Sequence, residues 1–281
     1  MRRFLRRLTL SQVLVALYLI AVGLFAVFPF FWMLSSSLKP PGQVFSPTPS
    51  LFPEELYLEG YIGLFAEGSN FLRAMGNSIF VAGATATLAS LFATLAAYSF
   101  SKFRFPGNRP LSFSLFLTQM FPHAAILVPL FLLFQTLQLF DRLSALVLAN
   151  LAFAVPVAIW LLIGFFDSIP DELTDAAMID GAGRLGVLFR IILPITINGI
   201  LATAMYIFIS TWSELLFAVT FTQSSGKATL PVLLSSFKGQ YNIDWAGLLA
   251  ASTLTALPVA VLFLLLQRFF IEGITSGATK G

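Results

Sequence analysis

The chain of 281 residues is 58% hydrophobic and only 10% charged, it contains no cysteine, and its formal net charge is +3. Its mean hydropathy of +0.89 excludes a soluble globular domain, because a soluble domain of this length needs far more polar surface. The absence of cysteine excludes disulfides and thiol catalysis. The composition therefore indicates an integral membrane protein.

Six long uncharged intervals predict an all-α membrane domain. Each exceeds the roughly 20 apolar residues that a helix needs to cross a bilayer, and none alternates in polarity as membrane β-strands do. We expect one domain, 1–281, with approximate spans at 11–35, 73–101, 110–138, 144–166, 195–221 and 247–269. The apolar run after the N-terminal arginines is too long for a secretory signal and lacks a convincing cleavage site, so we expect a retained anchor.

The basic residues predict an orientation. With the N-terminus in the cytoplasm, 11 of the 16 Lys and Arg residues fall on cytoplasmic segments, which is the bias that the positive-inside rule describes. We therefore expect both termini in the cytoplasm, outer loops at 36–72 and 222–246, and a cytoplasmic loop at 167–194. Because the basic residues flank spans, the net charge does not indicate nucleic-acid binding.

The loop 167–194 carries an acidic stretch at 168–183 between two apolar segments. Ser168, with Asp171 three residues later, predicts a capped helix start, and Pro170 suits the first turn. Gly181 and Gly183 are expected to end this helix and allow a reversal, after which 185–192 resumes as helix. This pattern alone fits two interpretations equally: a connector between two spans, or a docking surface for a soluble protein.

A family resemblance favours the docking surface. Asp175-Ala-Ala-Met-Ile-Asp-Gly-Ala182, followed by Ile191-Ile-Leu-Pro194, resembles the EAA loop of ABC-importer permeases. The chain is similar to the carbohydrate-uptake subclass, and in particular to the smaller maltose-importer permease, at Asn77-Ser78, Ile126-Leu-Val-Pro-Leu130, Gly164-Phe-Phe-Asp-Ser-Ile-Pro-Asp-Glu-Leu173, Trp212-Ser-Glu-Leu-Leu-Phe-Ala218, Thr229-Leu-Pro-Val232 and Gly239-Gln-Tyr-Asn-Ile-Asp-Trp245. Two positions depart from the pattern. Asp175 stands where Glu is usual, and Leu188 stands where Phe is usual, with Phe189 one step later.

The resemblance implies the type I importer permease fold, with a coupling helix at 171–180 that docks in a groove of a cytoplasmic ATPase subunit. The residues that it assigns to ATPase coupling are Asp171, Glu172, Asp175, Ala176, Ala177, Asp180, Gly181, Ala182 and Pro194. The last outer loop corresponds to the region that reaches toward the docked binding protein in the maltose importer.

The resemblance also implies the partners. It predicts a non-catalytic multi-pass subunit of a bacterial or archaeal cytoplasmic membrane, working with a second permease in a heterodimer, two ATPase subunits and an extracytoplasmic sugar-binding protein. The implied substrate is maltose, a malto-oligosaccharide, trehalose or a related sugar, with glycerol-3-phosphate also compatible. The sequence has no Gly-x-x-x-x-Gly-Lys-Ser/Thr loop, so we expect Mg-ATP on the partner subunits and no cofactor in this chain.

Four polar or aromatic residues predict a substrate pathway: Gln119, His123, Trp212 and Glu214. Ionisable groups inside a membrane usually face a cavity or a partner, and sugar sites combine aromatic faces with hydrogen-bonding groups. The alternatives are an interfacial carboxylate for Glu214 and a packing role for His123. In the maltose importer the larger permease supplies the main sugar contacts.

Two other functions compete with the importer permease. An ion-coupled secondary carrier for a small polar solute would be expected to hold more carboxylates or broken helices near mid-membrane than this chain offers. A membrane enzyme is the third hypothesis, but the single histidine cannot form a histidine-ligand cluster, so no metal site is expected. A carrier should be active alone, whereas a permease subunit should require its ATPase.

Overall fold

The computed structural model describes residues 10–239 and 242–278, and every regular element in that part of the chain is a helix. The one strand-like feature there is an isolated bridge between Lys238 and Ile243. The prediction of an all-α fold is confirmed. The four N-terminal arginines used for orientation, together with Gln240, Tyr241 and Lys280, lie outside the described residues. The chain divides into two units, 1–69 with 237–254 and 70–236 with 255–281, which we describe separately.

Within the described residues, five helical stretches are long and apolar enough to cross a membrane. They are α1 (Leu10–Ser37), α4 (Phe71–Lys102), α7 (Leu143–Asp167), the stretch Arg184–Trp212, and Trp245–Phe269 within α13 (Trp245–Ala278). A sixth candidate consists of Asn108–Met120 and His123–Thr136, which are bent by 91° where they meet. The apolar segments thus form five to six helices of spanning length.

The segment expected as one span at 110–138 is divided by Pro122. One arm contains α5 (Asn108–Leu117) and the 3-10 turn Thr118–Met120; the other contains the 3-10 turn His123–Ile126 and α6 (Leu127–Thr136). Phe121, directly before the proline, is extended with φ −74° and ψ 127°. A residue before proline avoids the α conformation, and proline itself donates no backbone hydrogen bond, so the helix stops here.

In the first unit, the loop 36–72 is held down by side chains. It contains the short helices α2 (Pro41–Val44) and α3 (Glu59–Phe65). Lys39 is only 3% exposed; its Nζ donates to the Ser50 carbonyl at 2.6 Å and lies 4.6 Å from the centre of the Trp32 ring. Gly60 of α3 approaches the Ala246 backbone so closely that a Cβ would collide with it. Side-chain and backbone contacts therefore hold this loop in place.

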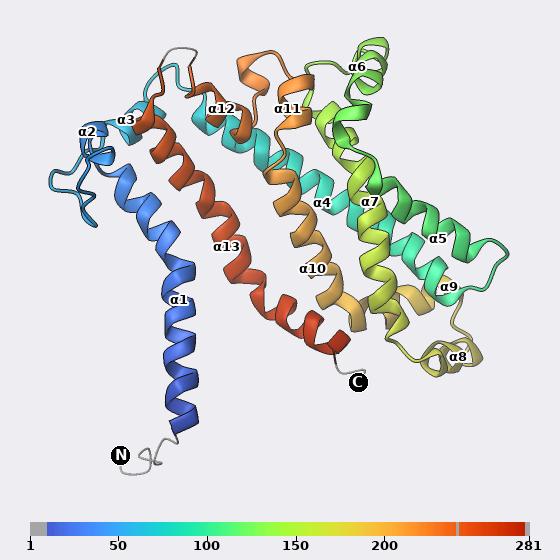
Figure 1. The fold of residues 1–281 in the computed structure, drawn as a ribbon. Coiled ribbons are helices and arrows are strands. Elements are labelled where there is room, and N and C mark those ends of the chain that lie inside the picture. The colour runs from blue at the N-terminus through green and yellow to red at the C-terminus, as the bar shows by residue number, and fades with distance from the viewer. Residues whose placement is uncertain (1–9, 240–241, 279–281) are drawn as a thin grey trace. The chain divides into compact units, whose positions relative to one another are not determined.

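In the second unit, α4, α7 and α10 (Leu193–Trp212) lie side by side (Figure 1). α4 presents a stripe of buried small residues, which pack with side chains from α7 and α10: Ala86, Ala89, Ala93 and Ala97. Small residues let helix backbones approach closely in membrane proteins. The same principle holds at Gly199 of α10, where a Cβ would lie 2.5 Å from the Phe165 ring of α7.

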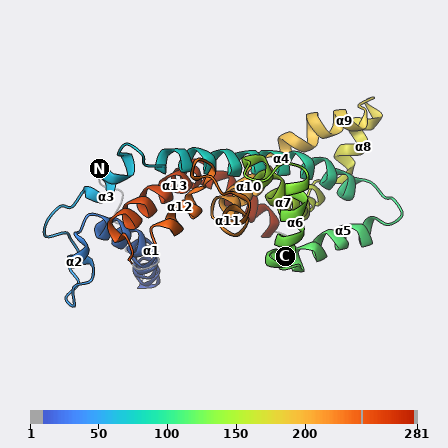
Figure 2. The same cartoon turned by 90° about the horizontal axis from the view of Figure 1, so that it is seen from above.

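Four short helices of the second unit lie near the two ends of α7. α8 (Asp171–Ile179) and α9 (Arg184–Val187) lie at one end, and α6 and α11 (Leu216–Phe221) lie at the other (Figure 1). α12 (Leu230–Ser236) follows α11. Seen from above, α9 and α5 extend on opposite sides of α4 (Figure 2). The stretch expected as a span at 195–221 is interrupted, because α10 ends at Trp212 and α11 begins at Leu216.

Candidate functional site

The acidic stretch folds as a short helix, α8, that directly follows α7. It begins at Asp171 after Pro170, and no side chain caps its first turn. The predicted capping by Ser168 is wrong, because the Ser168 hydroxyl donates to the Phe165 carbonyl at 2.6 Å instead. Ser168 therefore belongs to the end of α7. Asp171 and Glu172 in the first turn of α8 still face the positive end of its dipole.

Gly181 ends α8 as predicted. Its φ is +87°, its N–H donates to the Met178 carbonyl at 3.1 Å, and the Ala182 N–H donates to the Ala177 carbonyl at 2.9 Å. This pair of bonds is the Schellman arrangement, which requires a left-handed residue at the first position after the helix and is usually built on glycine. Gly183 has a different role, since its backbone is extended, with φ −69° and ψ 163°, and it directly precedes α9.

The two faces of α8 differ in their surroundings. On the inner side, Thr174 is buried, and Ala177 and Ala182 pack against the core of α4 and α7. On the outer side, Leu173, Met178 and Ile179 are exposed, Ile179 by 86%. Apolar side chains exposed within a polar segment mark interaction surfaces. We call the segment 167–194 the coupling loop; its exposed face is the candidate docking surface.

The acidic groups of the coupling loop also point outward. Glu172, Asp175 and Asp180 are exposed, and the one ion pair within residues 10–239 and 242–278 joins Lys102 to Asp171 at 2.8 Å. The hydrogen bond and charge of Lys102 hold the pKa of Asp171 below its ordinary value. The loop thus has three exposed carboxylates at Glu172, Asp175 and Asp180, while Asp171 is held by α4.

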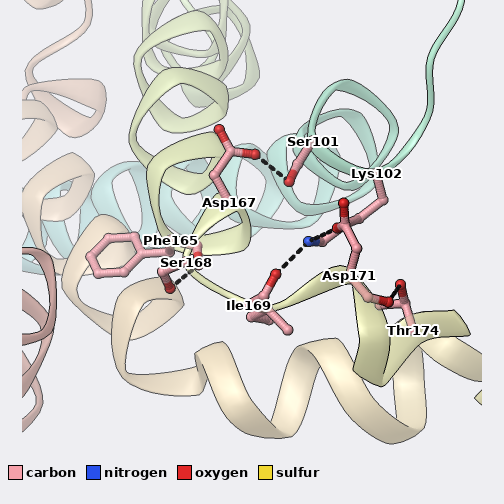
Figure 3. A network of polar contacts seen from close by, with 8 residues as sticks. All are labelled: Ser101, Lys102, Phe165, Asp167, Ser168, Ile169, Asp171 and Thr174. Atoms are coloured by element: carbon pink, nitrogen blue, oxygen red, sulfur yellow. Dashed lines mark hydrogen bonds and ion pairs between the residues drawn. The ribbon is translucent and has the colours of Figure 1, made fainter. Parts of the chain in front are cut away.

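Figure 3 shows how the last turn of α4 contacts this loop. The Lys102 ammonium donates to the Ile169 carbonyl at 2.7 Å and to Asp171 Oδ1 at 2.8 Å. The Ser101 hydroxyl donates to Asp167 Oδ1 at 2.5 Å. The Lys102 side chain is only 6% exposed, whereas Asp171 is 71% exposed. The start of the coupling loop is therefore fixed to α4 as well as to α7.

A cavity of about 440 Å³ lies between the middle of α7, α10 and the bend at Pro122. Gln119, His123 and Glu214 all line it, so the structure brings together three of the four predicted pathway residues. Trp212 is not among the lining residues; it is buried and stacks on Phe208 with ring centres 5.5 Å apart. Trp212 therefore packs within the bundle.

Glu214 has a structural role that the sequence did not reveal. Its carboxylate accepts hydrogen bonds from the backbone N–H groups of Phe217 at 2.7 Å and Ala218 at 3.1 Å. These groups lie in the first turn of α11, where N–H groups have no partner within the helix and where the dipole favours negative charge. Glu214 thus caps α11 while it borders the cavity.

His123 and Gln119 both contact Phe153 of α7. The His123 ring lies 4.0 Å from the Phe153 ring and 5.7 Å from the Phe217 ring, and Gln119 Nε2 donates to the Phe153 carbonyl at 3.1 Å. Sequence reasoning missed several polar residues that also line the cavity: Asn150, Tyr206, Ser210 and Thr211. A signal was present, since Tyr206, Ser210 and Glu214 recur every four residues, the spacing of one helix face.

Comparison with known proteins identifies the kind of molecule that carries these two sites. Residues 86–276 match the family of binding-protein-dependent transport system inner membrane components. The chain belongs to this family. The matched part contains the coupling loop and every residue that lines the cavity. Members of the family are membrane permease subunits rather than catalytic ones.

Similar proteins match the permease over nearly its whole length. It is 35% identical over 256 residues to the inner membrane ABC transporter permease protein YcjP of Escherichia coli (strain K12), with 91% of each chain covered. It is 31% identical over 280 residues to the trehalose/maltose transport system permease protein MalG of Thermococcus litoralis, covering 99% of this chain and 100% of the other. It shares its fold, with a TM-score of 0.77 and 22% identity, with a chain of a bacterial ABC transporter involved in import of the acidic polysaccharide alginate, covering 96% and 100% of the two chains.

In the permease, the departure at Leu188 has a clear structural outcome. Leu188 is fully buried in the core formed with α4 and α7, whereas Phe189 is 58% exposed. Leu188 therefore fills the packing position itself, and Phe189 joins the exposed face of the coupling loop. The helix passes through a π turn at Leu188–Ile192 directly before Pro194, and such turns are frequent at functional sites.

Proposed function

We propose that this permease forms half of the translocation pathway of a binding-protein-dependent ABC sugar importer and is driven by cytoplasmic ATPase subunits through its coupling loop. The exposed apolar face of α8, with Ile179 at 86% exposure, is the observation that carries this proposal. A bare apolar face on a polar loop is unfavourable in water, and a groove on a soluble partner would cover it.

The residues proposed to couple the permease to the ATPase lie in α8, in the turn that follows it and at the start of α10. They are Asp171, Glu172, Asp175, Ala176, Ala177, Asp180, Gly181, Ala182 and Pro194. Their roles differ: Ala177 and Ala182 position the helix against the core, and Gly181 sets the turn. The exposed carboxylate of Asp175 is one methylene shorter than the usual Glu, so it fits a basic partner group that reaches closer.

The proposed substrate is a sugar of the maltose or trehalose kind. Relatives support this choice, since the similar Thermococcus protein is described as a trehalose/maltose permease. The cavity lined by Gln119, His123 and Glu214 offers hydrogen-bonding groups beside the Phe153 ring, which is the mixture suited to a sugar. We assign Trp212 to packing in this pathway rather than to contact with the sugar.

The proposed assembly has a second permease in a heterodimer, two ATPase subunits that bind Mg-ATP, and an extracytoplasmic sugar-binding protein that contacts the loop 222–246. The permease itself carries no cofactor in this proposal. It lies in a bacterial or archaeal cytoplasmic membrane with both termini in the cytoplasm, as the distribution of basic residues supports.

The test is reconstitution of the complete complex in proteoliposomes, with uptake and ATP hydrolysis measured for maltose and trehalose. We expect sugar-loaded binding protein to stimulate both. Gly181→Trp should leave membrane insertion intact but uncouple uptake from hydrolysis, and Glu214→Gln should change the apparent affinity for sugar. Normal uptake by Gly181→Trp contradicts the coupling assignment, and unchanged affinity in Glu214→Gln contradicts the pathway. Uptake by the permease alone, driven by a proton or sodium gradient, would favour an ion-coupled carrier.

A further inference from the structure

α4 is unusual among the long apolar helices of the described chain in having neither an internal proline nor a break. α1, α7 and α13 contain Pro29, Pro156 and Pro258. The stretch Arg184–Trp212 contains a π turn, and the helix pair around Pro122 is sharply bent. Prolines and π turns are the places where helices kink. α4 therefore has neither of these kink sites along its axis.

One end of α4 holds the coupling loop on both sides of α8. At the start of the loop, Lys102 contacts the Ile169 carbonyl before α8 and Asp171, the first residue of α8. After α8, the Tyr98 hydroxyl donates to the Arg184 carbonyl at 3.0 Å. The chain connections from α7 and α10 to α8 run through a Pro-containing turn and a glycine turn. The hydrogen bonds from Tyr98 and Lys102 link α4 to the loop directly, without passing through either turn.

The other end of α4 holds the loop that follows α11. The Asn77 amide donates to the carbonyls of Gly226 at 3.1 Å and Ala228 at 2.8 Å. The Ser78 hydroxyl accepts a hydrogen bond from the Leu230 N–H at 2.8 Å. These contacts are made to backbone groups, so they fix the path of the loop whatever its side chains are. By helical rise, Asn77 and Lys102 lie about 38 Å apart along the axis.

We propose that α4 couples the two ends of the permease, with Lys102 positioning the coupling loop and Asn77 positioning residues 226–230. A displacement of α8 moves Lys102, the unbroken helix carries the movement along its axis, and Asn77 transfers it to the loop that follows α11. The proposal rests on the proposed function, because it makes α4 the path between the ATPase contact and the face that meets the binding protein.

Burial explains why Lys102 is suited to this role. The Lys102 side chain is only 6% exposed, so its ammonium group needs hydrogen bonds to offset its lost hydration. Lys102 finds these bonds on the coupling loop, in the Ile169 carbonyl and the Asp171 carboxylate. Movement of the loop away from α4 would leave the Lys102 ammonium group buried without these hydrogen bonds. The buried contact therefore favours joint movement of α4 and the loop over sliding between them.

The experiment uses the complete complex in nanodiscs, with Lys102→Met, Asn77→Leu and the double variant. Arg109→Met, an exposed charge near the same end of α4, is the matched control. Two quantities are measured: stimulation of ATP hydrolysis by sugar-loaded binding protein, and hydrogen exchange of the Leu230 amide with and without ATP. If Lys102 acted only locally, Lys102→Met would leave the response of Leu230 exchange to ATP unchanged.

We expect Lys102→Met and Asn77→Leu each to lower the stimulation about five-fold or more, the usual lower range for coupling between distant sites. The double variant should lose no more of this stimulation than either single variant, because both substitutions interrupt the same path. The response of Leu230 exchange to ATP should vanish in Lys102→Met and persist in Arg109→Met.

A response that persists in Lys102→Met, or losses that multiply in the double variant, would overturn the role of α4. If Lys102→Met does not assemble, Asn77→Leu tests the same path from the other end, and normal stimulation in that variant also overturns it. Failure of the wild-type permease to assemble with an ATPase would contradict the proposed function itself. The two failures are thus distinguishable.

Discussion

The turn after α8 offers a direct test of whether backbone strain sets the geometry of the coupling loop. Gly181 has φ +87°, whereas Gly183, two residues later, has φ −69°. A Cβ at either position would meet nothing within 4 Å. Gly181→Ala and Gly183→Ala therefore add the same methyl group to equally open space. They differ in the backbone conformation that the new residue must adopt.

The expected difference follows from that conformation. A left-handed residue other than glycine costs about 1–2 kcal/mol, and Gly183→Ala incurs no such cost. Both substitutions reduce the entropy of the unfolded chain by a similar amount, about 0.4–1 kcal/mol, so this contribution cancels between them. We expect the turn to open about 5–30-fold more often in Gly181→Ala than in Gly183→Ala.

Hydrogen exchange of the Gly183→Ala and Gly181→Ala proteins measures this opening. The informative amides are those of residues 181 and 182, which bond to the Met178 and Ala177 carbonyls. Faster exchange confined to Gly181→Ala would support the reasoning. Equal exchange in the two variants would refute it, because the left-handed conformation would then impose no cost on the turn.

Two further predictions concern packing and pH. Gly199→Leu should lower the thermal midpoint of the permease, since overpacking against the Phe165 ring costs about 1–3 kcal/mol. Gly83→Leu is the control and should leave the midpoint unchanged, because a Cβ at residue 83 meets no atom within 4 Å. Equal midpoints in the two variants would contradict the close packing of α7 and α10. Asp141 accepts hydrogen bonds from the Ser224 hydroxyl and from the backbone N–H groups of residues 223 and 224, and these bonds lower its pKa below its ordinary value. The contribution of Asp141 to stability is therefore complete above about pH 3.9, the pKa of an aspartate in the unfolded chain. It is lost as the pH falls through the lower pKa of the folded protein. Asp141→Asn should remove this dependence from exchange in residues 223–230, and an unchanged pH profile would contradict it.

The long helices could be predicted from the sequence because their signal is local and strong. Uninterrupted apolar segments of sufficient length have few alternatives in a membrane. The effect of each proline could not be predicted. Pro156 is buried inside α7, which continues through it, whereas the exposed Pro122 lies at a 91° bend. α7 packs against α4 and α10, and those contacts involve residues far apart in the sequence.

The candidate sites show the same division between local and distant causes. Gly181 was predicted correctly, because a helix end marked by glycine is encoded within a few residues. Ser168 was assigned to the wrong helix, because the pattern Ser-x-x-Asp does not say whether the hydroxyl turns forward to α8 or back to the Phe165 carbonyl. Glu214 was predicted at the edge of a cavity, but its capping of α11 depends on a break after Trp212 that periodicity did not indicate.

The role proposed for α4 lies beyond any local pattern. Lys102 contacts residues 67 and 69 positions later, and Asn77 contacts residues 149 and 151 positions later. In the sequence these are a basic residue after an apolar segment and an amide near its start, both ordinary features of membrane helices. The motif at 175–182 marks the proposed docking surface, but it does not indicate which helix would receive the motion. A chain that kept the motif and lost Lys102 would still present the docking surface, yet its buried link to α4 would be gone. Under the role proposed for α4, the motif alone does not predict coupled transport, and the hydrogen bonds of Lys102 are also required.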